Sequence, residues 1–256
     1  MDAAELFKLA GKVALVTGAT GGLGRAIAQA MAAQGACVIA SDLDAVACQA
    51  LADELSLAYG PGHLALAADL AQRGQADKLA EACGAVDILV CNAGLQGPAG
   101  PIGERSDADW ERVFDVNLRS ASQLAARLAP GMAERGAGSI ILMSSIAGLR
   151  GNRAIGLYGL SKAALAQLAR NLAVEWGPQG VRANAIAPGL IETPFAAGLI
   201  GDDAFMQRRL AMTPLRRVGQ PHEVAAVAVL LASPGGAFIT GQTLVVDGGT
   251  LISDGG

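Results

Sequence analysis

The chain of 256 residues is rich in hydrophobic residues (52%) and poor in charged ones (16%). This composition excludes a disordered chain, because disordered chains combine few apolar residues with many charges. The formal net charge of −4 gives no basic face for a nucleic-acid backbone, so we expect no nucleic-acid partner.

Short apolar runs alternate along the chain with longer stretches of helical periodicity. The runs predicted to form strands cover 13–17, 37–41, 64–67, 86–91, 139–143, 182–187 and 243–246. The predicted helices cover 22–34, 45–58, 74–83, 107–135, 157–176 and 222–232. Such alternation implies a parallel sheet with helices on both faces, joined by right-handed crossovers. We therefore predict an α/β fold, a doubly wound parallel sheet of about seven strands, in a single domain over residues 1–256.

The stretch 189–220 is long and lacks both patterns. It holds Pro194, Pro214 and several apolar side chains. An irregular loop of this length is uncommon inside a compact domain and is usually functional, so we expect a substrate lid. Two basic pairs in it, Arg208-Arg209 and Arg216-Arg217, are interpreted as solvated loop charges, with contact to an anionic ligand as the alternative.

Residues that could bind a metal or direct the chain to a membrane are sparse. Four cysteines without metal-like spacing lie in the first half of the chain: Cys37, Cys48, Cys83 and Cys91. His63 and His222 are far apart and no carboxylate cluster joins them, so we expect no metal site.

The N-terminus, with Asp2 and Glu5, does not resemble a secretory signal. The longest apolar helical stretch, 224–232, is far short of the roughly 20 residues that span a bilayer. These features predict a cytoplasmic protein with reduced thiols and no membrane partner.

A glycine-rich turn follows the first predicted strand and precedes an alanine-rich helix. It contains Gly18, Gly22 and Gly24, a spacing that differs from the common dinucleotide fingerprint. Glycines let the backbone approach a ligand closely, and a helix N-terminus offers free N–H groups to a pyrophosphate. No Gly-Lys-Ser/Thr follows, which excludes a nucleoside-triphosphate loop. The turn is therefore predicted to bind a dinucleotide.

Asp42 ends the second predicted strand, where a carboxylate can accept hydrogen bonds from the adenosine ribose hydroxyls. The same charge would repel the 2′-phosphate of NADP, which predicts a preference for NAD on the order of a hundredfold. The alternative is that Asp42 or Asp44 only caps the next helix. Asp44 fits the cap position better, and Asp42 is then available to the ribose.

Nearly the whole chain resembles the short-chain dehydrogenase/reductase family. The matching segments are, in chain order, Thr-Gly-Ala-Thr-Gly-Gly-Leu-Gly at 17–24, Asp69-Leu70, Asn92-Ala93-Gly94, Asn117, Ser145, Tyr158 with Lys162, Pro188-Gly189 with Thr193, and the C-terminal segments 241–243 and 246–249. One departure is Cys91, which replaces the first Asn of the family's Asn-Asn-Ala-Gly motif. The resemblance implies a Rossmann-like fold, NAD as the cofactor, and hydride transfer between NAD(H) and a small secondary alcohol or ketone.

The resemblance also assigns roles to individual residues. Tyr158 would be the acid/base, and Lys162, one helical turn away, would bring the phenol pKa from about 10 toward neutrality and hold the nicotinamide ribose. Ser145 would hydrogen-bond the substrate oxygen; its 13-residue offset from Tyr158 favours it over Ser144. Asn117 would hold a water that connects Lys162 to solvent. The implied cofactor-binding residues are Gly18, Thr20, Gly22, Leu23, Gly24, Asp42, Asp69, Leu70, Asn92, Ala93, Gly94, Tyr158, Lys162, Pro188, Gly189, Ile191 and Thr193.

The candidate substrate pocket is largely apolar. Its predicted residues are Gln96, Ala147, Ile155 and Leu190, with Leu95, Leu149 and Asn152 nearby and Phe195, Leu199, Ile200, Phe205 and Met206 from the lid. Arg153 could pair with a substrate carboxylate, but a solvated surface arginine is the more ordinary interpretation.

The motif residues are also compatible with two other functions, and the family resemblance implies an oligomeric state. An NADP-dependent ketone or 3-oxoacyl reductase shares the motifs, and a non-catalytic dinucleotide sensor needs only the cofactor loop. The family resemblance further implies a homotetramer, built through the helices at 107–135 and 157–176 and the C-terminal strand.

Overall fold

The structure, a computed structural model, describes residues 3–253, apart from the Ala4 side chain. Asp2 and the two extreme ends of the predicted domain lie outside the described residues. All four cysteines are free, and Cys48, Cys83 and Cys91 are buried. No helix within residues 3–253 is both long enough and apolar enough to cross a membrane.

Seven parallel strands form one sheet, which confirms the predicted fold class. The strands are β1 (Val13–Thr17), β2 (Cys37–Ser41), β3 (Leu64–Ala65), β4 (Ile88–Cys91), β5 (Gly138–Met143), β6 (Val181–Pro188) and β7 (Thr243–Val246). Their order is β3-β2-β1-β4-β5-β6-β7, and every neighbouring pair is parallel. The chain therefore winds outward in both directions from β1 and β4, and the crevice beyond the carboxyl ends of these two strands is where ligands bind in such sheets.

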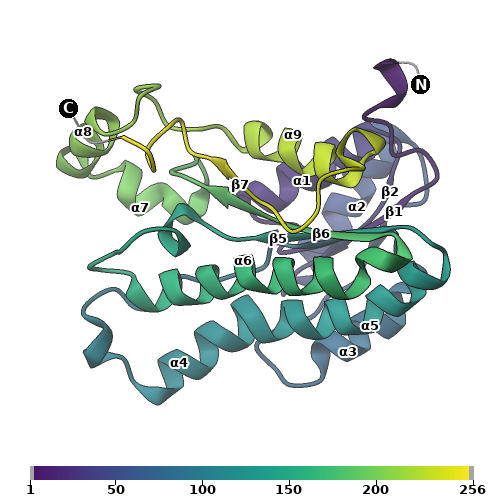
Figure 1. The fold of residues 1–256 in the computed structure, drawn as a ribbon, viewed down its shortest axis with the longest axis horizontal. Coiled ribbons are helices and arrows are strands. Elements are labelled where there is room, and N and C mark those ends of the chain that lie inside the picture. The colour runs from purple at the N-terminus through teal and green to yellow at the C-terminus, as the bar shows by residue number, and fades with distance from the viewer. Residues whose placement is uncertain (1–2, 254–256) are drawn as a thin grey trace.

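Helices cover both faces of the sheet (Figure 1). One face carries α1 (Gly22–Ala33), α2 (Ala45–Tyr59) and α9 (Pro221–Ala232), and the other carries α3 (Gln75–Cys83), α4 (Asp107–Phe114), α5 (Ser120–Glu134) and α6 (Gly156–Trp176). Short 3-10 helices occupy Ala3–Glu5, Ile102–Glu104, Ile146–Gly148, Gly177–Gln179, Pro194–Ala196 and Pro234–Gly236.

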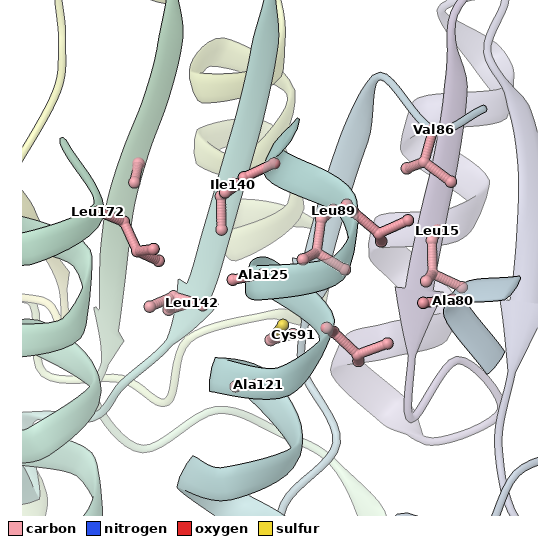
Figure 2. Packing of buried hydrophobic residues seen from close by; sticks show 14 of the residues in the cluster. Leu15, Ala80, Val86, Leu89, Cys91, Ala121, Ala125, Ile140, Leu142 and Leu172 are labelled. Atoms are coloured by element: carbon pink, nitrogen blue, oxygen red, sulfur yellow. The ribbon is translucent and has the colours of Figure 1, made fainter. Parts of the chain in front are cut away.

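Small side chains let the helices lie close to the sheet. Figure 2 shows Ala121 and Ala125 of α5 facing Leu89 and Cys91 of β4 and Leu142 of β5. All five are buried. Because this core contains few large aromatic side chains, helices and sheet must lie close together to reach native packing density, and alanine side chains allow this close approach.

Two predicted segments differ from the structure. The helix predicted at 107–135 is interrupted by a π-helical turn, Asp115–Arg119, between α4 and α5. The stretch predicted as irregular at 189–220 contains the 3-10 helix Pro194–Ala196, α7 (Ala197–Ile200) and α8 (Asp203–Ala211). No residue of α7 or α8 is fully buried, so neither helix has the apolar stripe that marks a helix in a sequence.

Candidate active site

A cavity of about 450 Å³ opens at the carboxyl ends of the strands, where residues following β1, β2, β4, β5 and β6 meet residues of the 189–220 segment. The predicted site residues that line it are Gly18, Gly22, Leu23, Gly24, Asp42, Asp69, Leu70, Asn92, Ala93, Gly94, Gln96, Ser145, Ala147, Ile155, Tyr158, Lys162, Pro188, Gly189, Leu190, Ile191 and Thr193. Thr20 and Asn117 do not line it. Within residues 3–253, no three His, Cys, Asp or Glu side chains gather as metal ligands.

Three glycines of the first turn, Gly18, Gly22 and Gly24, lie too close to neighbouring parts of the chain to carry a side chain. A Cβ at Gly18, whose φ is +62°, would lie 2.9 Å from the Cα of Ala93. At Gly24 a Cβ would lie 2.0 Å from the carbonyl oxygen of Gly18, and at Gly22 it would lie 2.7 Å from the Cβ of Thr193. No side chain within the described chain caps the N-terminus of α1. The turn therefore combines close backbone approach with free N–H groups, as phosphate binding requires.

Asp42 lies at the end of β2 and lines the same cavity. Its Oδ2 accepts hydrogen bonds from Thr20, at 3.1 Å from the backbone nitrogen and 2.6 Å from Oγ1. Its Oδ1 accepts one from the backbone nitrogen of Leu43 at 2.7 Å. Asp44, by contrast, caps α2 by accepting from the backbone nitrogens of Val46 and Ala47, as its position predicts. Thr20 thus lies behind Asp42 and orients its carboxylate.

Asn92 ties β4 to the glycine turn. Its Nδ2 donates to the carbonyl oxygens of Thr17 and Gly18, both at 3.0 Å. The Thr17 hydroxyl in turn accepts from the backbone nitrogens of Asn92 and Ala93, both at 3.1 Å. The neighbouring Cys91 is buried in the core, and the Thr17 hydroxyl and the Asn92 amide make the contacts that join β4 to the turn.

Ser145, Tyr158 and Lys162 meet on one wall of the cavity. Tyr158 and Lys162 lie one turn apart on α6, with the Lys162 Nζ 5.4 Å from the centre of the Tyr158 ring. Lys162 is buried, and its Nζ donates to the carbonyl oxygen of Met143 at 2.7 Å. The Ser145 Oγ accepts from the backbone nitrogen of Ala147, which leaves its hydroxyl proton available as a donor.

Ser144, the competitor of Ser145, has a different environment. It is buried, and its Oγ donates to the carbonyl oxygen of Lys162 at 2.7 Å. Its hydroxyl proton is therefore used to hold β5 against α6. This arrangement makes Ser144 a support for Lys162 and leaves Ser145 as the serine that can donate into the cavity.

The pKa of Tyr158 is shifted in the direction opposite to expectation. Burial raises it to about 12, and a hydrogen bond with Ser145 only partly offsets this effect. Burial also lowers the pKa of Lys162 to about 8. Burial dominates because desolvation penalises the phenolate, and the Lys162 ammonium is itself desolvated and donates to Met143. The expectation that Lys162 brings the phenol pKa toward neutrality stays a prediction.

Asn117 lies in the π-helical turn, and both the oxygen and the nitrogen of its side-chain amide form hydrogen bonds within the protein. Its Oδ1 accepts from the backbone nitrogen of Leu95 at 2.8 Å, and its Nδ2 donates to the Leu95 carbonyl oxygen and to the Ser161 Oγ, both at 2.9 Å. A Cβ at Gly94 would lie 3.1 Å from the Lys162 Nζ and 3.2 Å from the Asn117 Oδ1. Asn117 and Lys162 thus approach each other across Gly94. This arrangement makes Asn117 a positioning residue, and the water relay stays a prediction.

At the substrate end, the four predicted substrate residues Gln96, Ala147, Ile155 and Leu190 line the cavity, as do Phe195 and Leu199 of the lid. The rings of Phe195 and Tyr158 are tilted, with centroids 6.3 Å apart. The predicted lid residues Ile200, Phe205 and Met206 do not line this cavity, and Arg153 is exposed and does not line it either.

Three arginines also lie on the cavity wall. Arg112 and Arg150 are not predicted there, and Arg209 is interpreted from the sequence as a solvated charge with a ligand contact as the alternative. Arg209 belongs to a basic pair that the sequence places in an irregular loop, and only recognition of α8 could have separated it from Arg208.

Known proteins resemble this chain over nearly its full length. A family model described as enoyl-(acyl carrier protein) reductase matches residues 18–250. Galactitol 2-dehydrogenase (L-tagatose-forming) of Cereibacter sphaeroides is 39% identical over 251 residues, which are 97% of this chain and 98% of that protein.

Two solved structures show the same architecture. A gluconate 5-dehydrogenase from Burkholderia cenocepacia, in complex with NADP and tartrate, has a TM-score of 0.92 at 33% identity, with 98% of this chain and 100% of that one covered. A 7α-hydroxysteroid dehydrogenase complexed with NADH and 7-oxo glycochenodeoxycholic acid has a TM-score of 0.91 at 37% identity, with 97% and 98% covered. These similarities span the glycine turn, the Ser145–Tyr158–Lys162 wall and the C-terminal strand. The protein belongs to the short-chain dehydrogenase/reductase family and is an oxidoreductase that acts on CH–OH groups.

Proposed function

We propose that the protein transfers a hydride between NAD(H) and a secondary alcohol or ketone, with Tyr158 as the acid/base. The observation that carries this proposal is one cavity lined by the glycine turn, Asp42, Ser145, Tyr158 and Lys162 together. A non-catalytic sensor would need the first two features and would not need the last three. Turnover of any secondary alcohol or ketone by the purified protein separates the two functions.

The residues present fit a nicotinamide dinucleotide, which the family binds. Backbone N–H groups at Gly22 to Gly24 would hold the pyrophosphate, because no side chain caps the N-terminus of α1 there. Asp42 would accept the adenosine ribose hydroxyls, Asp69 and Leu70 would flank the adenine, and Thr193 would contact the nicotinamide end. When bound, the dinucleotide donates or accepts the hydride, and the protein's task is to orient the substrate and move one proton.

The chain's own residues divide that task. Tyr158 gives its phenol proton to the substrate oxygen in ketone reduction and takes the hydroxyl proton in alcohol oxidation. Ser145 donates a hydrogen bond to the same oxygen and fixes its position. Lys162 places a buried positive charge 5.4 Å from the Tyr158 ring centre, which favours the phenolate once the proton has left. A pKa of about 12 keeps Tyr158 protonated at neutral pH, the form that ketone reduction requires.

Asp42 supports the choice of NAD over NADP. A 2′-phosphate on the adenosine ribose would meet this carboxylate, which is already oriented by Thr20. The basic residue nearest the turn, Arg25, pairs with Glu54 on α2 and does not line the cavity. Like-charge repulsion and lost hydrogen bonds together favour NAD on the order of a hundredfold.

We expect NADH to raise the melting temperature of the protein and NADPH to raise it less or not at all. In Asp42→Ala the Kd values for NADH and NADPH should lie within a few-fold of each other, because the charge that repels the 2′-phosphate is gone. Asp44→Ala is the matched control: it removes a carboxylate two residues away, weakens the cap of α2 by about 1 kcal/mol, and should keep the NAD preference. A larger shift with NADPH than with NADH in the unmodified protein would replace this proposal with the NADP-dependent ketone or 3-oxoacyl reductase.

We also propose a homotetramer in the cytoplasm. Support for assembly comes from apolar side chains on the outer surface of α6, where Leu160 is 45% and Val174 is 80% exposed, and from Val245 of β7, which is 41% exposed. Leu160 and Val174 lie near opposite ends of α6, with the exposed polar residues Gln167, Arg170 and Asn171 between them, and exposed apolar side chains of this kind can pack against a second copy. Light scattering at micromolar concentration should give about four times the chain mass of 25.7 kDa, and a value near one chain mass would contradict the tetramer.

A further inference from the structure

Arg150 and Arg209 reach the cavity from two separate elements. Arg150 follows the 3-10 helix Ile146–Gly148, in the same segment that carries Ser145, and Arg209 comes from α8 of the lid. Both side chains are half-buried. The two arginines therefore lie at the substrate end of the cavity. The glycine turn, by contrast, packs against Thr193 and Pro194, at the other end of the lid segment.

Neither guanidinium has an acidic partner within residues 3–253. The arginines that do form ion pairs there are Arg25, Arg105, Arg119, Arg127, Arg135 and Arg217. The Arg209 guanidinium carbon lies 5.5 Å from the centroid of the Phe205 ring. A half-buried cavity wall thus holds two guanidinium groups whose hydrogen-bond donors point to no acceptor of the described chain.

The two charges also act on each other. Burial first, and then the charge of Arg150, lower the pKa of Arg209, while Asp247 acts in the opposite direction. Asp247 is held by the backbone nitrogens of Gly249 and Leu251, so it does not swing to form an ion pair. One fixed carboxylate does not compensate the two guanidinium charges. A bound anion would relieve the repulsion between the arginines.

We propose that Arg150 and Arg209 bind a carboxylate of the substrate, which makes the natural substrate a hydroxy acid or the corresponding keto acid. Guanidinium groups present paired N–H donors that match the two oxygens of a carboxylate, and the negative charge of a carboxylate offsets the repulsion between the two arginines. This inference rests on the proposed dehydrogenase function and deepens it, because it selects the class of alcohol.

The test compares acids with their uncharged amides. Gluconate and cholate serve as a small and a large hydroxy acid, and gluconamide and cholamide serve as their neutral counterparts. We expect at least one acid to have a higher kcat/KM than its amide. Arg150→Gln and Arg209→Gln should each lower kcat/KM for that acid about 10- to 100-fold, mainly through KM, and leave the value for the amide nearly unchanged.

The chain offers matched controls beside each arginine. Arg208→Gln changes the next residue on α8, and Arg153→Gln changes an exposed residue three positions after Arg150; neither side chain lines the cavity. Both control variants should behave as the unmodified protein toward acids and amides alike. If they reduce acid turnover as strongly as the cavity variants, general surface charge explains the effect and the proposed carboxylate site is wrong.

A binding measurement separates this inference from the function on which it rests. The acid should add to the melting temperature of the protein in the presence of NADH, the amide should add less, and Arg209→Gln should abolish the difference. An acid that binds in this way without turnover would sustain the arginine site while the dehydrogenase function fails. Turnover of neutral alcohols with no preference for either acid would overturn the arginine site alone.

Two further results would overturn the carboxylate site by assigning the arginines to another ligand. Weaker NADH binding in Arg150→Gln and Arg209→Gln would assign the pair to the cofactor. A higher kcat/KM for sorbitol 6-phosphate than for sorbitol, without a preference for either acid, would assign it to a phosphate.

Discussion

Replacing Tyr158 with Phe should lower kcat for any alcohol or ketone substrate by about 10³- to 10⁴-fold, because the change removes the one proton donor placed beside the substrate oxygen. The substitution deletes a single oxygen atom and keeps the ring that packs near Phe195. The fold and the dinucleotide-induced rise in melting temperature should therefore be preserved. Steady-state kinetics with saturating NADH measures the loss, and a decrease of less than tenfold would remove Tyr158 from the role of acid/base.

The same variant allows the phenol pKa to be measured. The chain has two tyrosines, and Tyr59 on α2 is 47% exposed and does not line the cavity. Subtracting the phenolate absorbance titration of Tyr158→Phe from that of the unmodified protein isolates Tyr158. We expect a midpoint well above 10 in protein without added dinucleotide, since burial raises the pKa to about 12. Tyr59→Phe should leave this midpoint and the turnover unchanged, and a midpoint near neutrality would contradict the burial argument.

Ser145→Ala should lower kcat by about 10²- to 10³-fold, the usual cost of removing one donor to a developing oxyanion. The hydroxyl of Ser145 accepts from the Ala147 backbone nitrogen and donates toward the cavity, where it also meets Tyr158. Truncation therefore removes a contact with the substrate oxygen and a contact that orients the phenol. The loss should appear in kcat more than in KM, because both contacts act on the reacting oxygen.

Ser144→Ala is the matched comparison. It removes a buried hydrogen bond to the Lys162 carbonyl oxygen, so it should lower the free energy of unfolding by about 1–3 kcal/mol and reduce kcat much less than Ser145→Ala does. Denaturant unfolding and steady-state kinetics on both variants test the distinction. Equal losses of kcat in the two variants would show that the serines cannot be separated as support and donor.

Local sequence features determined the layers of the fold and the places of the ligand-binding turns. Alternating apolar runs and helical stretches are enough to predict a parallel sheet, because each pattern reports which side of its own element is buried. The cap formed by Asp44 and the glycine turn at 18–24 are equally local, since their geometry is set within a few residues. The roles of Ser145, Tyr158 and Lys162 are what the family resemblance implies. Local spacing adds only that Tyr158 and Lys162 share one face of a helix.

Properties that depend on several distant segments were decided by the tertiary structure. The helices of the lid have no buried stripe of their own, and the π-helical turn at Asn117 arises where α4, α5 and the Leu95 loop meet. The pKa of Tyr158 depends on how completely the surrounding elements exclude water, a quantity that no local pattern contains. Arg150 and Arg209 lie 59 positions apart in the sequence, and each by itself has the appearance of a solvated charge. Only the folded chain brings them to one cavity, because electrostatic interactions depend on distance in space and on the solvent between the charges, and sequence separation reports neither.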